Sequence, residues 1–228
     1  YDKVEQLVRN ALQVGQREDG QSDVFANLDE VLNEDYRHPI PMGIPGIDRL
    51  LKGGLAKGEI GVVLAPTGVG KSTLLTKISN HAFNLGYNVL QIFFEDNPKI
   101  IQRKHFTLWT KIHPDELSLK KDEVMAKVHE IKTTMPNKLI LKKLPSDTMS
   151  MLQIKNQIRK MIADGVRIDM VLLDYIDCVV PDRNLGDEWK SEGSVMRAFE
   201  AMCHELDLVG WTATQGNRQS ISSDVVTT

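Results

Sequence analysis

The sequence predicts an α/β fold with a central, mostly parallel sheet flanked by helices and preceded by a short helical linker. From Glu59 onward, five short apolar runs alternate with segments of helical pattern. Strands of a parallel sheet are buried on both faces and joined by crossover helices, so they appear in a sequence as apolar runs spaced in this way. The runs are IGVVLA (60–65), NVLQIFF (88–94), LILKKL (139–144), MVLLD (170–174) and GWTAT (210–214).

Residues 1–40 are expected to form a helical linker or subunit-docking segment. An apolar stripe at helical spacing covers residues 4–12, and a second covers residues 24–32 after Asp23, a residue type favoured as a helix N-cap. With so little chain of their own to pack against, these stripes either dock on a neighbouring subunit or fold back on their own domain. After the proline-marked segment HPIPMGIPG, residues 41–228 are expected to form one domain.

Helical patterns follow four of the five strands. The first starts near Lys71, the second runs from about Pro98 to Lys111, the third covers residues 150–165, and the fourth is a long stretch after Gly186. This order predicts βαβ units, and in such sheets ligands bind at the carboxyl ends of the strands. The residues that end each strand are therefore the candidates for chemistry.

The bulk composition is that of an ordinary globular protein, with 228 residues, 41% hydrophobic and 26% charged. The net charge of −3 gives no global basic field, so a nucleic-acid role would need a local basic strip or one assembled from several subunits. Cys178 and Cys203 lack metal-ligand spacing and indicate reduced core thiols. No apolar run approaches the ~20 residues that span a bilayer, and the first ten residues are no signal peptide. We expect a soluble, cytoplasmic protein without a membrane partner.

The segment APTGVGKST follows the first strand and fits a phosphate-binding loop, with Ala65 where the strict pattern has Gly. Glycines let the backbone N–H groups point inward, and the helix that begins there adds its positive end to the same anion site. Lys71 would reach the β- and γ-phosphates, and the Ser72 hydroxyl would ligate Mg²⁺. We therefore expect a nucleoside triphosphate, with Mg²⁺, as the ligand. The contacting residues would be Ala65, Pro66, Thr67, Gly68, Val69, Gly70, Lys71, Ser72 and Thr73.

Two further strands end in residues that suit the same ligand. Asp174 ends its run and is the natural second contact for Mg²⁺ in a phosphate-loop protein, while Asp177, three residues beyond the strand, is the weaker candidate. The alternative is that Asp174 merely begins a loop. Gln215 ends the last run, and an amide there could donate to a γ-phosphate oxygen and report its presence, although an amide at a strand end is also unremarkable.

The strand after the phosphate loop ends in two adjacent acids with different expected roles. Glu95 could polarise the water that attacks the γ-phosphate, because hydrolysis of that bond needs an oriented nucleophile. Asn97 and Pro98 predict a helix N-cap followed by proline in the first turn. Asp96 would then lie near the positive end of that helix. We expect one catalyst and one structural neighbour.

Four stretches of this sequence resemble the hexameric DnaB-type replicative helicases, within the wider RecA-like ATPases. They are GIPGIDRLLKGGLAKGE (43–59), the phosphate loop, QIFFED (91–96), and VLLDYIDCV with the later HELDLVGWTATQGNR (204–218). The likeness covers about residues 40–220, and DY at 174–175 with the QxNR pattern ending at Arg218 favours this family over recombinases.

The resemblance implies a RecA-like ATPase motor domain that binds ATP and Mg²⁺ between the subunits of a hexameric ring. By its pattern, Glu95 would be the general base, Lys71 a catalytic phosphate contact, and Gln215 the γ-phosphate sensor; Ser72 and Asp174 would bind Mg²⁺. Loops 181–193 and 216–228 would face a central channel. Arg183, Lys190 and Arg218 are then candidate contacts to single-stranded DNA, and each also fits a solvated surface charge.

The expected function is thus an ATP hydrolase of the 5′–3′ DNA helicase type, with single-stranded DNA and a primase or loader as partners. Two alternatives stay open. One is a recombinase ATPase of the RecA/RadA kind, in which ATP promotes filament formation. The other is an ATP-gated assembly or signalling protein of related fold that does not move on DNA. The arginine finger that the family supplies to a neighbouring subunit is not assigned.

Overall fold

The computed structural model describes residue 32 and residues 37–182 and 188–216. The chain divides into two units, Tyr1–Tyr36 and Arg37–Thr228. The apolar stripes predicted at 4–12 and 24–32 lie outside the described residues, apart from the helical and exposed Leu32. All that follows concerns the second unit.

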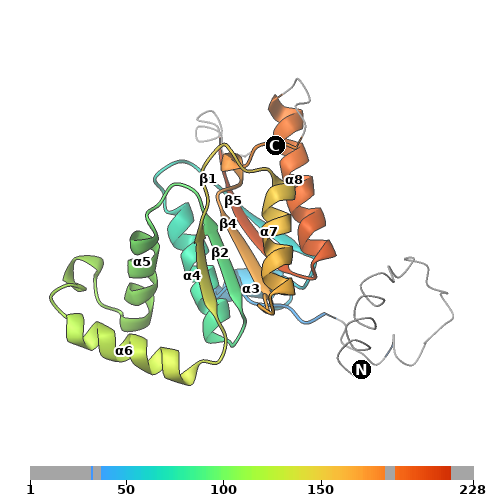
Figure 1. Cartoon of the computed structure of the whole chain (residues 1–228). Helices are drawn as coiled ribbons and strands as arrows, with labels where there is room; N and C mark the ends of the chain where they lie inside the picture. The colour runs from blue at the N-terminus through green and yellow to red at the C-terminus, as the bar shows by residue number, and fades with distance from the viewer. Residues whose placement is uncertain (1–31, 33–36, 183–187, 217–228) are drawn as a thin grey trace, which may run out of the picture. The chain divides into compact units, whose positions relative to one another are not determined.

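Five parallel strands form one sheet, as the sequence predicts (Figure 1). They are β1 (Ile60–Ala65), β2 (Val89–Phe93), β3 (Leu139–Lys143), β4 (Met170–Asp174) and β5 (Val209–Gln215). Their order in the sheet is β1-β5-β4-β2-β3, and every neighbouring pair is parallel. The last strand in the sequence therefore lies between the first strand and the rest of the sheet.

The helices connect these strands in the expected order. They are α3 (Pro45–Leu50), α4 (Lys71–Asn84), α5 (Pro98–Thr110), α6 (Lys121–Thr134), α7 (Met151–Ala163) and α8 (Glu188–Glu205), with short 3₁₀ turns η1 (Pro114–Glu116) and η2 (Ile176–Cys178). Neither α3 nor α6 is predicted by the sequence pattern. The reason is clear for α6, because Val124 is its only buried residue and the helix has no broad apolar stripe. No helix among the described residues combines the length and apolar character needed to cross a bilayer.

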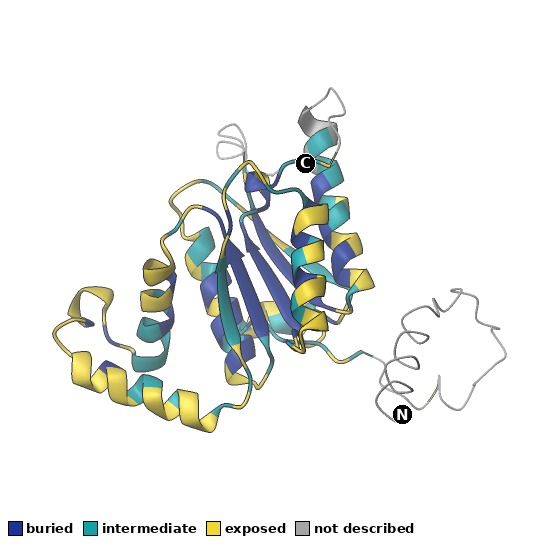
Figure 2. Cartoon of the chain, in the orientation of Figure 1, coloured by how far each residue is buried: buried dark blue, intermediate teal, exposed yellow. Residues whose placement is uncertain are grey.

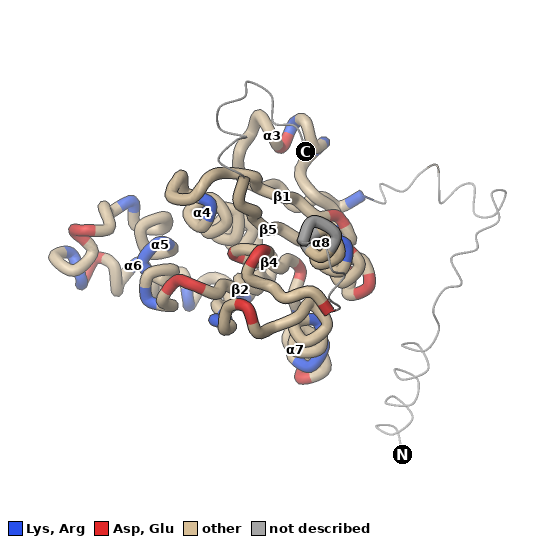
Figure 3. Tube along the Cα trace, turned by 90° about the horizontal axis from the view of Figure 1, so that it is seen from above, with Lys and Arg blue, Asp and Glu red and all other residues tan. Residues whose placement is uncertain are grey.

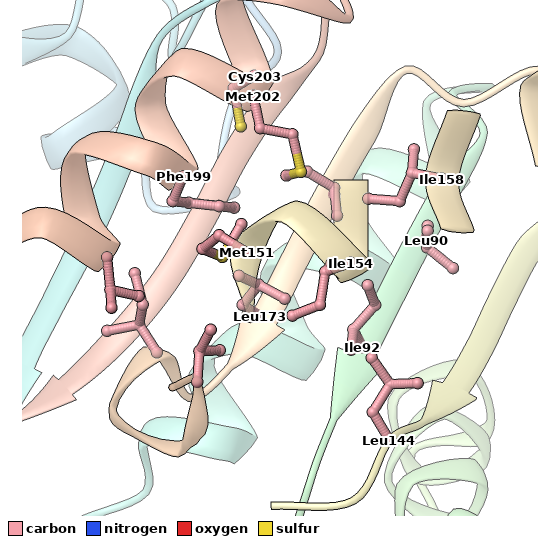
Figure 4. Packing of buried hydrophobic residues seen from close by; sticks show 14 of the residues in the cluster. Leu90, Ile92, Leu144, Met151, Ile154, Ile158, Leu173, Phe199, Met202 and Cys203 are labelled. Atoms are coloured by element: carbon pink, nitrogen blue, oxygen red, sulfur yellow. The ribbon is translucent and has the colours of Figure 1, made fainter. Parts of the chain in front are cut away.

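Helices α7 and α8 cover one face of the sheet, and a large apolar cluster lies beneath them (Figure 4). Alternate residues of the strands point into it, among them Ile92 and Leu173. They meet Ile154 from α7 and Phe199 from α8, both fully buried. Figure 2 shows the buried sheet between helices whose outer faces are exposed. This packing fixes the central strands, and with them the positions of their carboxyl ends.

Helix α4 covers the opposite face and packs against β2, β4 and β5. Leu75 and Ile78 of α4 are fully buried against Met170 and Leu172 of β4. The register of β1 on this face depends on Gly61, because a Cβ there would come within 2.4 Å of the Trp211 ring. The indole of β5 thus occupies the space that a side chain on β1 would need.

Candidate functional site

The carboxyl ends of β1, β5, β4 and β2 lie along one edge of the sheet, because the four strands are parallel neighbours. Figure 3 looks onto this edge and shows acidic stretches close to β2 and β4. The topology therefore brings together the four segments that the sequence singles out: the phosphate loop, Glu95, Asp174 and Gln215.

The phosphate loop connects β1 to α4. Gly68 and Gly70 have φ angles of 83° and 103°, and a Cβ at either position would meet nothing within 4 Å. Glycine is therefore required by backbone conformation and not by space. Pro66 is half-buried, whereas Thr67, Val69 and Thr73 are exposed. Because α4 begins at Lys71 with no side-chain cap, its first N–H groups are available to an anion at this helix end.

Lys71 and Ser72 begin α4 and point into the site. The Lys71 ammonium donates to the carbonyl oxygens of Ala65 at 2.9 Å and Pro66 at 3.3 Å, so it is folded over its own loop. The Ser72 hydroxyl donates to Oδ1 of Asp174 at 3.0 Å. The residues predicted for phosphate and for Mg²⁺ are therefore adjacent, although Ser72 and Asp174 are 102 positions apart in the sequence.

Asp174 is 5% exposed, and burial raises the pKa of its carboxyl group above the ordinary value, while the hydrogen bond from Ser72 acts in the opposite direction. A divalent cation would supply the positive charge that favours the ionised form. A hydroxyl and a carboxylate are hard oxygen donors that suit Mg²⁺. Among the described residues no group of three His, Cys, Asp or Glu side chains could hold a metal ion. The protein would therefore supply two oxygens, leaving the remaining positions to phosphate and water.

Glu95 follows β2 and is exposed at the edge of the sheet. Its Oε1 accepts a hydrogen bond from the Tyr175 hydroxyl at 3.1 Å, and its backbone oxygen accepts one from Lys143 at 3.3 Å. The Tyr175 ring lies 5.6 Å from the Lys71 ammonium. Burial is the largest of several causes that raise the pKa of Tyr175, so its hydroxyl stays protonated and donates. Tyr175 therefore touches both the phosphate-loop lysine and the candidate base.

Asp96 and Asn97 serve the start of α5. Asn97 is the N-cap, its side chain accepts from the N–H of Lys99 at 2.9 Å, and Pro98 follows in the first turn, as the sequence predicts. Asp96 pairs with Lys104, two turns along the same helix, at 3.1 Å. This ion pair is not foreseen from the sequence, and it gives Asp96 a partner away from Glu95.

Gln215 is the last residue of β5 and is exposed. Its backbone N–H donates to Asp177 at 2.8 Å, and the Thr214 hydroxyl donates to the other oxygen of the same carboxylate at 2.8 Å. Asp177 is therefore bound to the end of β5, whereas Asp174 is the acid beside Ser72.

A chain of polar side chains, buried at its centre, runs from α5 back to the phosphate-loop helix. The Trp109 indole N–H donates to Asn84 at 3.2 Å, the Asn84 amide donates to Asn80 at 3.2 Å, and the Asn80 amide lies 3.2 Å from Nδ1 of His105. His105 and Asn80 are almost fully buried. These contacts tie α4 to α5.

The same chain continues through β2. Nε2 of His105 lies 3.1 Å from Oε1 of Gln91, and the Gln91 amide donates to Thr76 at 3.1 Å. The Thr76 hydroxyl in turn donates to the backbone oxygen of Ser72 at 2.7 Å. The Ser79 hydroxyl also contacts Gln91 at 2.9 Å. The first turn of α4 is thus linked through hydrogen bonds to the strand that precedes Glu95.

The three candidate DNA contacts are not brought into the site by the described residues. Arg183 and Arg218 lie outside the described residues, as do most of the two loops predicted to face a channel. Lys190 lies within α8. Conversely, Tyr175 and Lys104 contact Glu95 and Asp96 and were missed as site residues. The sequence signals that could have indicated them are weak: a tyrosine directly after Asp174, and a lysine eight residues after Asp96.

Known families and solved structures share this arrangement. The family model for the DnaB-like helicase C terminal domain matches residues 39–223. The structure is similar to a solved helicase ATPase domain, with a TM-score of 0.70 and 17% identity, covering 86% of this chain and 70% of that one. It is also similar to a DnaB-like replicative helicase described with its interactions with primase, with a TM-score of 0.72 and 17% identity, covering 90% of this chain and 51% of that one. These two likenesses show a shared RecA-like fold.

Sequence relatives with curated names are DNA repair proteins RadA. The protein from Mycobacterium tuberculosis (strain CDC 1551 / Oshkosh) is 28% identical over 104 residues, which cover 45% of this chain and 22% of the relative. The protein from Mycolicibacterium smegmatis is 37% identical over 57 residues, covering 25% of this chain and 12% of the relative. The chain thus matches less than a quarter of these relatives' length.

Proposed function

This chain belongs to the DnaB-like helicase C-terminal domain family, and from that premise we propose that it is the ATPase motor of a ring-shaped replicative DNA helicase. It would hydrolyse ATP at subunit interfaces, translocate on single-stranded DNA and unwind duplex. The observation that carries the proposal is the 3.0 Å hydrogen bond between Ser72 and Asp174 beneath the phosphate loop, with Glu95 at the next strand end.

The residues of the site divide the work of hydrolysis among themselves. The N–H groups of loop residues 67–70 and the start of α4 would bind the phosphates, and Lys71 would exchange its carbonyl contacts for phosphate oxygens. Ser72 and Asp174 would hold Mg²⁺, which when bound neutralises charge on the β- and γ-phosphate oxygens. Glu95 would orient the attacking water and accept its proton. The Gln215 amide would contact the γ-phosphate.

The partners belong to the proposal as well. We infer single-stranded DNA as the track, contacted by Arg183, Lys190 and Arg218, a homo-hexameric ring as the assembly, and a primase or loader as an associated protein. The structural likeness to a helicase described with primase supports the last of these. We also propose 5′–3′ movement and a cytoplasmic location. Unwinding of forked duplexes with only one tail present would test the direction: activity that requires the 3′ tail would refute it.

The proposal is tested by ATP turnover with and without single-stranded DNA in Glu95→Gln and in its neighbour Asp96→Asn as matched control. We expect Glu95→Gln to lower turnover on the order of a hundredfold or more, the effect of losing a general base, while nucleotide affinity stays within a few fold. Asp96→Asn breaks only the ion pair with Lys104 and should leave turnover within about twofold, since partly exposed ion pairs contribute little. Unaltered turnover in Glu95→Gln would remove this residue from the mechanism, and a rate indifferent to DNA would argue against a motor.

A recombinase ATPase is the second candidate, and the RadA relatives are the observation that favours it. Particle images decide between the two. Closed rings support the helicase, whereas open helical filaments formed with ATP and DNA would support the recombinase.

A further inference from the structure

The turn that follows β4 lies between two strand ends of the site. In the sheet, β4 has β2 on one side and β5 on the other. Phe93 of β2 is paired with Asp174, and Thr212 of β5 is paired with Leu173. A side chain that leaves the turn can therefore reach the end of either neighbour, and two of its residues do so on opposite sides.

Tyr175 reaches toward β2. Its hydroxyl donates to Oε1 of Glu95 at 3.1 Å, and its half-buried ring packs against the apolar clusters on both faces of the sheet. Glu95 is exposed, so its carboxylate has no surrounding core to fix its rotamer. Because the Tyr175 ring is rigid and packed, its hydroxyl supplies a fixed point that selects one orientation of the carboxylate.

Asp177 reaches toward β5. The pairing of β4 with β5 ends at Leu173 and Thr212, yet β5 continues to Gln215. Beyond that point the Asp177 carboxylate accepts hydrogen bonds from the Thr214 hydroxyl and the Gln215 N–H, each at 2.8 Å. On the other side Gln215 is paired with Ala65 of β1. Asp177 therefore replaces the missing ladder contacts and holds the strand end at which Gln215 lies.

The turn itself is anchored. Ile176, between the two side chains, is 5% exposed in the cluster under α7 and α8, and Cys178 is 4% exposed. The N–H of Cys178 donates to Tyr175 at 3.3 Å, and the N–H of Asp147 donates to Cys178 at 3.0 Å. Tyr175 and Asp177 are therefore fixed to one rigid piece of backbone.

We propose that the turn Tyr175–Asp177 acts as a positioning bracket for hydrolysis, in which Tyr175 orients the general base Glu95 and Asp177 holds the end of β5 that presents Gln215. This inference rests on the proposed function, because it assigns positioning residues to that reaction. The bracket ties the strand end that carries the base to the strand end that contacts the γ-phosphate.

Tyr175→Phe tests the first half, since it removes one hydroxyl and leaves the ring. We expect kcat for ATP hydrolysis to fall about tenfold, within the range caused by a misplaced reacting group, while KM and the affinity for a fluorescent ATP analogue stay within about twofold. In the Glu95→Gln background the same change should have no further effect, because the hydroxyl acts through that carboxylate. Tyr87→Phe makes the same chemical change away from the site and should leave kcat unchanged.

The background variant also separates this inference from the function it rests on. If Glu95→Gln keeps full turnover, the assignment of the base fails. If Glu95→Gln is inactive and Tyr175→Phe turns over like wild type, only the bracket is refuted. A fall in kcat of equal size in both backgrounds would likewise refute it, because Tyr175 would then act independently of Glu95.

Asp177→Ala and Asp177→Asn test the second half. An asparagine can retain both contacts, with its oxygen accepting from Gln215 and its amide donating to the Thr214 oxygen, whereas alanine loses both. We expect alanine to lower kcat about tenfold with nucleotide affinity unchanged, and asparagine to restore it to within about threefold of wild type. If asparagine is as impaired as alanine, the negative charge of Asp177 is what matters and the positioning role is wrong.

Discussion

The buried His105 makes the stability of this domain sensitive to mild acid. The Trp109 indole can only donate a hydrogen bond, so the Asn84 atom that it meets is the oxygen, and Asn84 must donate its amide to the Asn80 oxygen. The Asn80 amide then donates to Nδ1 of His105, and Nε2–H of His105 donates to Gln91. The chain of contacts thus has one direction, and it requires a neutral imidazole. A proton on Nδ1 would face another donor.

The size of the effect follows from the pKa. Burial lowers the pKa of His105 from 6.5 to about 4 in the folded protein. Because the unfolded chain binds the proton more readily, the contribution is fully present above pH 6.5 and is lost as the pH falls toward 4. Each pKa unit corresponds to about 1.4 kcal/mol, so the whole shift amounts to about 3 kcal/mol, of which about 2 kcal/mol is lost between pH 7 and pH 5. That is a large part of a typical free energy of unfolding of about 5 to 15 kcal/mol.

Urea unfolding of the wild type and His105→Gln at pH 7 and pH 5 measures this difference. The wild type should lose about 2 kcal/mol more than the variant, which corresponds to about 1 M urea in the midpoint for a slope near 2 kcal/mol per M. His105→Gln should start about 1 to 3 kcal/mol less stable at pH 7, because polar groups of the chain lose partners. His129→Gln, an exposed change on α6, should retain the wild-type pH dependence. Equal losses in the wild type and His105→Gln would refute the assignment of a neutral, buried His105.

Three further changes test the packing and the caps around the site. Gly61→Ala places a Cβ 2.4 Å from the Trp211 ring and should cost about 1 to 3 kcal/mol of unfolding free energy, with a shift in tryptophan emission; unchanged stability would show that the ring moves freely. Phe199→Ala empties a fully buried position under α8 and should cost about 3 to 5 kcal/mol in urea unfolding, and a loss below about 1 kcal/mol would mean that the cluster collapses around the gap. Asn97→Ala removes the α5 cap and should cost about 1 kcal/mol, while Asn97→Ser, which restores an acceptor, should recover most of it; failure of that recovery would argue against capping.

The sequence predicts the strands well because burial on both faces leaves a simple signal. All five apolar runs are strands, and Glu95, Asp174 and Gln215 lie at strand ends or shortly after them, at one edge. The α5 cap at Asn97 is likewise local and is confirmed. These features depend on residues close together in the chain, so a single sequence contains them.

Contacts between elements are less accessible, because they depend on the order of the strands. The hydrogen bond from Tyr175 to Glu95 spans 80 positions and exists only because β4 lies beside β2. Gln91 lies inside an apolar run, and its burial is favourable only because α4 and α5 supply partners such as Thr76 and His105. Nothing local indicates such partners.

The position of β5 in the sheet has a consequence for how the domain is made. Within the described residues β1 pairs only with β5, so β1 cannot join the sheet during synthesis until residues 209–215 have also left the ribosome. The phosphate loop is attached to β1, and its Mg²⁺ partner Asp174 is attached to β4. Joining strands so far apart in sequence is slow, and domains of this kind pass through partly paired states. Nucleotide can therefore bind only to a chain whose synthesis has passed β5, and ATP would act on the newborn protein as a ligand that selects the completed sheet.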